Sequence, residues 1–306
     1  MAGGFAHITA VGFALERLEE ISSLTSGDKK ALFNFRSYVE VGAVSPDYPY
    51  LGRQSEWADN MHYRDTGMMI RKGITEIGSL APGPARDRCF SWLLGYAAHV
   101  ATDLTIHPVV EAKVGKYKGH ETEHRTCEMH QDAFIWQKNN IGEIGVADYV
   151  RQMIGHCSDA DGALNPDVTA VWTRMLAYTY PEDFESNKPN VEEWNKGFRK
   201  IVDVADDAGA VLFPFTRHTL AGHGIVYPSA DDIEDTFISD LDTPEGKMDY
   251  EDIFNKAVNS VISAWSTIGK VLNQKSPEAL QDIPDGDLDT GKRLSDGASF
   301  IYWRSA

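Results

Sequence analysis

The chain has 306 residues, of which 42% are hydrophobic, so it can bury a sizeable core in one large domain or two small ones. It carries 46 acidic against 29 basic residues, and the net charge of -17 excludes a generally basic surface for nucleic acid or anionic lipid. Three cysteines without CxxC spacing give no disulfide framework, and the start MAGGFAH has no signal-peptide pattern. We therefore expect a cytoplasmic protein, with export without a leader as the alternative.

Helical periodicity dominates the chain, and alternating strand patterns are scarce. The predicted helices span residues 5–18, 29–41, 56–77, 86–107, 120–138, 147–157, 167–178, 191–208 and 249–272. Irregular chain is expected at 45–53, and a long surface loop rich in Gly, Pro and acidic residues at 213–246. These patterns predict an all-α fold, a single multi-helix domain over residues 1–306 with a long late loop insertion. No clear linker supports a second domain after Asp159.

The most apolar stretch, residues 89–106, is about as long as a minimal membrane span. It contains His99 and Asp103, whose burial in hydrocarbon would be costly, so we interpret it as a buried helix of a soluble protein. Pro108 is expected to end this helix.

Histidines and carboxylates recur at one-turn spacing on two neighbouring predicted helices. His99, Asp103 and His107 stand at i, i+4 and i+8, so their side chains project from one helix face. His124 and Glu128 repeat the i, i+4 spacing on the next helix. Two helices can thus direct imidazoles and carboxylates into one cleft, and these are ligands that zinc prefers. Further polar residues nearby are His120, His130 and Asp132.

Less specific explanations compete with this zinc site. With ten histidines, composition alone predicts one or two such pairs, so His124 and Glu128 by themselves are weak evidence. His99 and Asp103 differ because apolar residues surround them, and a buried imidazole and carboxylate need partners or a metal ion. The alternative for this pair is a hydrogen-bonded His and Asp in the core.

The order of further motifs gives a family resemblance. Asp47 lies in GAVSPDYPYLGRQSEWADNMHY, His62 follows on a helix, and His7 opens the first helix. With HVATDLTIH and HRTCE, this order resembles the zinc-dependent phospholipase C and single-strand nuclease superfamily over residues 5–135. The resemblance implies an all-α fold that holds zinc ions in a cleft. The implied ligands are Asp47, His62, His99 and Asp103 for one ion, His107, His124 and Glu128 for a second, and His7 with a bridging Asp103 for a third.

The resemblance also implies how many zinc ions bind and what the protein does. Secreted relatives complete the third site with an N-terminal tryptophan, which does not stand at the start of this sequence, so two to three zinc ions are expected. The implied activity is phosphodiester hydrolysis, with Asp47 as the general base. By analogy with a choline pocket, Tyr48 and Asp59 are the expected substrate-binding residues. The expected partner is a small phosphodiester or a phospholipid, with transient contact with a membrane surface.

Two other functions stay open at this point. One is a single-strand nuclease or another phosphoesterase, which the negative charge and the lack of a visible basic groove disfavour. The other is a zinc-stabilised binding protein without catalysis. His218 and His223 are interpreted as surface-loop histidines, and the acidic run 282–289 as a solvated loop. Nothing in the sequence predicts an oligomeric state.

Overall fold

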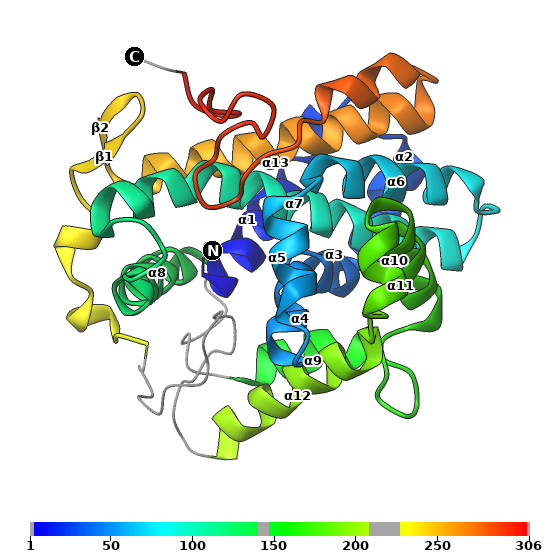
Figure 1. The fold of residues 1–306 in the computed structure, drawn as a ribbon, viewed down its shortest axis with the longest axis horizontal. Helices are drawn as coiled ribbons and strands as arrows, with labels where there is room; N and C mark the ends of the chain where they lie inside the picture. The colour runs from blue at the N-terminus through cyan, green and yellow to red at the C-terminus, as the bar shows by residue number, and fades with distance from the viewer. Residues whose placement is uncertain (1–2, 140–146, 208–226, 305–306) are drawn as a thin grey trace.

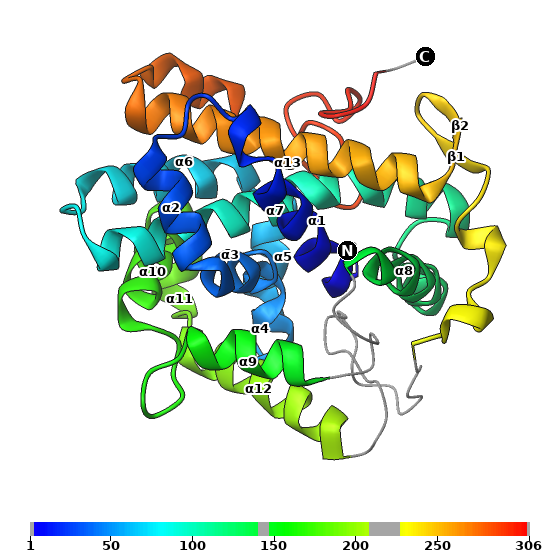
Figure 2. The ribbon, with the colours of Figure 1, turned by 180° about the vertical axis from the view of Figure 1, so that it is seen from behind.

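A computed structural model describes residues 3–139, 147–207 and 227–304. Its central element is α7 (Pro84–Val114), which runs beside α13 (Tyr250–Asn273) in both views of the molecule (Figure 1, Figure 2). Within these ranges the strands are β1 (Leu241–Thr243) and β2 (Gly246–Met248), which form one antiparallel hairpin. The predicted all-α fold class is confirmed.

The remaining helices surround this pair. The α-helices are α1 (Gly4–Glu16), α2 (Ser26–Asn34), α3 (Arg36–Gly42), α4 (Tyr48–Leu51), α5 (Ser55–Tyr63), α6 (Thr66–Ser79), α8 (Glu121–Trp136), α9 (Ala147–His156), α10 (Pro166–Thr179), α11 (Pro181–Ser186) and α12 (Val191–Asp207). The 3-10 helices are η1 (Leu18–Glu20), η2 (Ser45–Asp47), η3 (Gln137–Asn139), η4 (Ala230–Asp232), η5 (Asp235–Phe237) and η6 (Pro277–Asp282).

The core is built around α7, because this helix is apolar on nearly every side. Every residue from Cys89 to Val110 is buried, and α1, α3, α6, α8, α10 and α13 all pack against the helix. A helix that is hydrophobic all round belongs in the interior, which agrees with the interpretation of residues 89–106 as a buried helix. Among the described residues, no helix has both the length and the apolar character needed to cross a membrane.

Pro108 does not end α7, which continues to Val114, and the predicted end was wrong. Proline has no N–H to donate within the helix, so carbonyl groups one turn earlier need other partners or close cover. The C-terminal segment covers this turn: Gly291 packs against Pro108 and the Leu104 carbonyl, which loses its helical donor, and the Trp303 indole donates to the neighbouring Thr105 carbonyl at 2.9 Å. Tertiary packing therefore offsets the helix-breaking tendency of Pro108.

Other boundaries differ where the chain turns sharply. The predicted helix 56–77 is divided into α5 and α6 at Asp65, which has a positive φ of 47°. The predicted helix 29–41 is likewise divided into α2 and α3. Of the predicted loop 213–246, residues 213–226, including His218 and His223, lie outside the described residues. The remainder holds short 3-10 helices and β1, and the single domain over 1–306 stays a prediction.

Candidate metal centre

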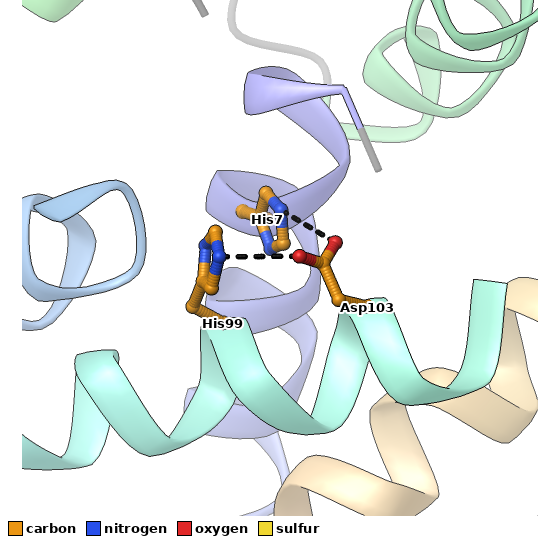
Figure 3. A group of neighbouring side chains, drawn as sticks. All are labelled: His7, His99 and Asp103. Atoms are coloured by element: carbon orange, nitrogen blue, oxygen red, sulfur yellow. Dashed lines mark ion pairs between the residues drawn. The ribbon is translucent and has the colours of Figure 1, made fainter. Parts of the chain in front are cut away.

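One face of α7 places two buried candidate ligands beside a third from α1. His99 and Asp103 lie one turn apart on α7, with the His99 Nε2 3.2 Å from the Asp103 Oδ2. The His7 side chain comes from α1, and its Nε2 lies 3.3 Å from the Asp103 Oδ1 (Figure 3). The His7 and His99 rings stack with their centroids 4.2 Å apart. All three side chains are fully buried.

Two more candidate ligands approach His99 from η2 and α5. The His62 Nε2 lies 3.2 Å from the Asp47 Oδ1, 3.3 Å from the His99 Nε2 and 3.9 Å from the Asp103 Oδ2. Asp47 and His62 are also buried. The structure therefore brings together five residues that the family resemblance implies as zinc ligands. A ligand atom of His99 lies within 4.8 Å of ligand atoms of both His7 and Asp47.

The orientation of the histidine rings is fixed from behind. The His62 Nδ1 donates to the Ala58 carbonyl at 2.7 Å, and the His99 Nδ1 donates to the Ala43 carbonyl at 2.9 Å. The second bond requires α3 to lie very close to α7, and Gly95 permits this because a Cβ there would lie 1.9 Å from the Val39 carbonyl oxygen. Each ring thus directs its Nε2 toward the other ring.

This arrangement fits a divalent cation. With Nδ1 donating, both Nε2 atoms are acceptors, and two acceptors 3.3 Å apart repel unless a proton or a metal ion separates them. Neither ring nitrogen of His7 and neither carboxylate oxygen of Asp47 has a hydrogen-bond partner among the described residues. Buried polar atoms are rarely left so. Imidazole nitrogen and carboxylate oxygen together match zinc, so the donor set fits the ion that the sequence indicates.

A second group extends the centre along α7 toward α8. The His107 Nε2 lies 3.7 Å from the Asp103 Oδ1 and 3.9 Å from the Glu128 Oε1. The His124 Nε2 donates to the Gly115 carbonyl at 2.6 Å, which leaves its buried Nδ1 without a hydrogen-bond partner in the described part of the chain. The His107 and His124 ring centroids are 6.4 Å apart. Asp103 therefore faces both groups.

The pKa shifts in the centre favour the metal-binding protonation states of Asp103 and His7, whereas they oppose those of His99 and Glu128. Burial opposes ionisation of Asp103, but the neighbouring His99 and His7 hold the pKa of this carboxyl well below its usual range. Burial together with the charge of His99 lowers the pKa of His7, so its imidazole is neutral near pH 7. Burial, with a contribution from Asp103, raises the pKa of Glu128 to about 7.

The residues expected to bind substrate are placed differently from one another. Tyr48 is fully buried, with its ring 4.6 Å from Phe198, so a head group could reach that ring only if other side chains moved. Asp59 is exposed and accepts a hydrogen bond of 2.9 Å from the Tyr50 hydroxyl. The Tyr50 ring centroid lies 5.9 Å from that of His62, so this partly exposed tyrosine lies beside the centre. Sequence reasoning missed Tyr50.

The other polar residues near the helical motif have separate roles. His120 is exposed and donates to the Lys116 carbonyl, and the His130 Nδ1 accepts from the backbone N–H of Glu234. Asp132 accepts hydrogen bonds from backbone N–H groups at the start of α1 and thereby holds the helix that carries His7.

One residue that the sequence assigned to a solvated loop reaches the centre. The Asp289 Oδ1 lies 3.5 Å from the His107 Nδ1, and the side chain is only 16% exposed. No helical spacing relates Asp289 to the ligands, and the motif around it, DGDLDTG, reads as a turn, so the sequence holds no signal for this contact.

Comparison with known proteins agrees with this geometry. Neither the curated proteins nor the solved structures gave a match. The family model described as zinc dependent phospholipase C matches residues 6–182, more than half of the chain, and this range contains all eight candidate ligands. The chain therefore belongs to the zinc dependent phospholipase C family, whose members are zinc-dependent hydrolases.

Proposed function

We propose that this protein is a phospholipase C that hydrolyses the phosphodiester of phospholipid head groups with two to three zinc ions. The observation that carries the proposal is the buried convergence of the His62 and His99 Nε2 atoms, 3.3 Å apart, on the carboxylates of Asp47 and Asp103. A structural histidine would direct both ring nitrogens to fixed protein partners, whereas these rings direct one nitrogen at each other.

The candidate ligands divide into overlapping groups around Asp103. Asp47, His62, His99 and Asp103 would hold one ion, and His107, His124 and Glu128 another; His7 with Asp103 would contribute to a third. Bound zinc would neutralise phosphate charge and lower the pKa of a water molecule, so that a nucleophile exists near neutral pH. Three protein ligands on the second ion leave room for water or substrate, as in catalytic rather than structural sites.

Asp47 is the proposed general base or water-orienting group. Burial opposes its ionisation, but the imidazoles of His99 and His62 outweigh this effect and lower the pKa of the carboxyl. Asp47 is therefore an anion at neutral pH and can accept a proton or a hydrogen bond from water. The 3.2 Å contact of its Oδ1 with the His62 Nε2 directs the carboxylate toward the centre.

A cationic head group is the proposed recognition element of the substrate. Tyr50 offers an aromatic face beside His62, and its hydroxyl is bonded to the exposed carboxylate of Asp59. An aromatic face next to an anion suits a quaternary ammonium such as choline. The family resemblance implies Tyr48 for head-group binding, and this stays a prediction. Because Tyr48 is buried, we favour Tyr50 for the role.

One preparation tests the proposal against its alternatives. We would measure bound zinc and then the hydrolysis of phosphatidylcholine in mixed micelles, a phosphocholine nitrophenyl ester and single-stranded DNA, before and after chelation. Zinc-dependent cleavage of the first two substrates supports a phospholipase C. Cleavage of DNA alone would replace it with a nuclease, and tightly bound zinc without any hydrolysis would indicate a zinc-stabilised binding protein.

A further inference from the structure

Three candidate ligands share a feature behind the ring. In His62, His99 and His124, one ring nitrogen donates to a backbone carbonyl, at 2.7, 2.9 and 2.6 Å respectively. An acceptor in that position sets the tautomer and holds the ring plane, so the other nitrogen presents its lone pair to a metal.

Among the described residues, no backbone carbonyl bonds a ring nitrogen of His107, and a carboxylate lies behind the ring instead. Its Nε2 faces Asp103 and Glu128, at 3.7 and 3.9 Å, while its Nδ1 faces the Asp289 Oδ1 at 3.5 Å. Neither ring nitrogen of His107 has a hydrogen-bond partner among the described residues, so nothing else there competes for Nδ1. The His107 Nε2 therefore faces the candidate ligands, and the Nδ1 faces Asp289.

Asp289 is itself held from the ligand-bearing helix α5. The Tyr63 hydroxyl donates to the Asp289 Oδ2 at 2.8 Å, and the Asp289 backbone N–H donates to the Asp287 Oδ1 at 3.0 Å. The preceding residue, Leu288, donates its N–H to the carbonyl of His62 at 3.0 Å. The chain at 288–289 is thus bonded to one candidate ligand and faces a second.

The same segment is fixed to α6 at a distance from His107. Asp285 forms an ion pair of 2.7 Å with Arg71 and accepts from the Met68 backbone N–H at 2.8 Å. We call residues 285–289 the C-terminal strap; its course across α7 and α13 is part of the red segment in Figure 1. Because the anchor at Asp285 is separate from the contact at Asp289, the two can be tested separately.

We propose that Asp289 is a positioning residue of the metal centre: its carboxylate accepts a hydrogen bond from the His107 Nδ1–H, and the His107 Nε2 is thereby presented to zinc. The inference rests on the proposed zinc centre and adds to it a residue from outside the family-matched range 6–182. A carboxylate behind a ligand imidazole raises its basicity and fixes its tautomer, and outer partners of this kind are worth about 10- to 100-fold in metal affinity.

The test compares Asp289→Ala, Asp289→Asn and Tyr63→Phe with the wild-type protein. The control is Asp296→Asn, which makes the same charge change at an exposed residue further along the C-terminal segment. We would measure zinc stoichiometry and dissociation constants by chelator competition, the His107 Nδ1–H resonance of the zinc-loaded protein by NMR, and thermal unfolding of the zinc-free protein.

The expected result is a graded loss confined to one ion. Asp289→Ala should weaken the binding of one zinc about 10-fold or more and shift or abolish the His107 Nδ1–H signal. Asp289→Asn keeps an accepting oxygen, so its loss should be smaller, and Tyr63→Phe should have the smallest effect. Asp296→Asn should leave the zinc affinities and the His107 Nδ1–H resonance unchanged.

Two results would overturn the inference. The first is zinc affinity within about twofold of wild type in Asp289→Ala, with the His107 resonance unmoved. The second is an equal loss of every zinc ion in Asp289→Ala with a matching drop in unfolding temperature. That pattern would mean that the variant only loosens the strap, as Asp285→Asn is expected to do. A wild-type protein that binds no zinc would instead contradict the proposed function itself.

Discussion

The ligand face of α7 and the C-terminal strap reach the same centre by different means. On α7 the candidate ligands follow one another at every turn, so the backbone of one buried helix sets their spacing. The strap has irregular backbone and is held by individual bonds, such as that from Tyr63 to Asp289. The helix therefore determines which atoms can share a metal, whereas the strap determines how firmly one of the rings is held.

The largest expected effect comes from the helical side of this comparison. Asp103→Asn should lower zinc content and kcat/KM together, the latter by more than about 100-fold, because a neutral amide is a poor bridge between cations in a buried site. Metal analysis and hydrolysis of a nitrophenyl phosphodiester on one preparation measure both. Asp87→Asn is the matched control, since it makes the same change in the first turn of α7. Full zinc content and full turnover in Asp103→Asn would show that Asp103 is not a zinc ligand.

The docking of α1 is expected to depend on pH through Asp132. This carboxylate accepts from the N–H groups of Phe5 and Ala6 and from the Tyr227 hydroxyl, yet burial raises its pKa to about 7. A carboxyl whose pKa is raised on folding adds stability below its unfolded pKa, and this stability is lost as pH rises through about 7.

The unfolding free energy of the wild type should therefore fall by about 3 kcal/mol relative to Asp132→Asn between pH 5 and pH 8. Denaturant unfolding at the two pH values measures this difference, and Asp296→Asn serves as an exposed control. Parallel pH dependence in wild type and Asp132→Asn would show that Asp132 does not titrate in this range.

Gly3→Ala should also undock α1, because a Cβ there would lie 2.1 Å from the Asp132 Oδ2.

A pair of variants tests whether His107 and His124, which are held by different groups, bind the same zinc ion. His107 is backed by the Asp289 carboxylate and His124 by the Gly115 carbonyl, but both are assigned to the second zinc. His107→Ala and His124→Ala should each lose about one zinc equivalent, and the double variant should lose no more than either alone. Native mass spectrometry counts the ions. Additive loss of two equivalents would mean that the ligands are wrongly divided.

The same contrast explains how much could be predicted from the sequence. His99, Asp103 and His107 were found because helix geometry turns their spacing into a shared face. Asp289 could not be found in this way, since its contact with His107 depends on packing between segments 182 positions apart, the separation of the two residue numbers. The continuation of α7 past Pro108 was missed for the same reason: Gly291, far along the chain, packs against Pro108 and the Leu104 carbonyl. Local patterns predict helices and their faces, whereas long-range packing decides which loops complete them.

The smallest expected effect lies on α4, beside the centre, where two tyrosines two positions apart are placed in opposite ways. Tyr50 is partly exposed beside His62, whereas Tyr48 is buried against Phe198 with no hydrogen-bond partner for its hydroxyl in the described chain. Tyr50→Ala should raise the KM for choline lipids, because the cation–π contact is lost. The expected loss of apparent binding free energy is about 1 to 2 kcal/mol. It should leave hydrolysis of a nitrophenyl phosphodiester without an ammonium nearly unchanged. Tyr48→Phe, which keeps the buried ring, is the control and should behave as wild type on both substrates. An unchanged KM for choline lipids in Tyr50→Ala, together with a raised KM in Tyr48→Leu, which removes the buried ring, would return the head group to Tyr48. It would also require the aromatic side chains around that ring to move when the substrate binds.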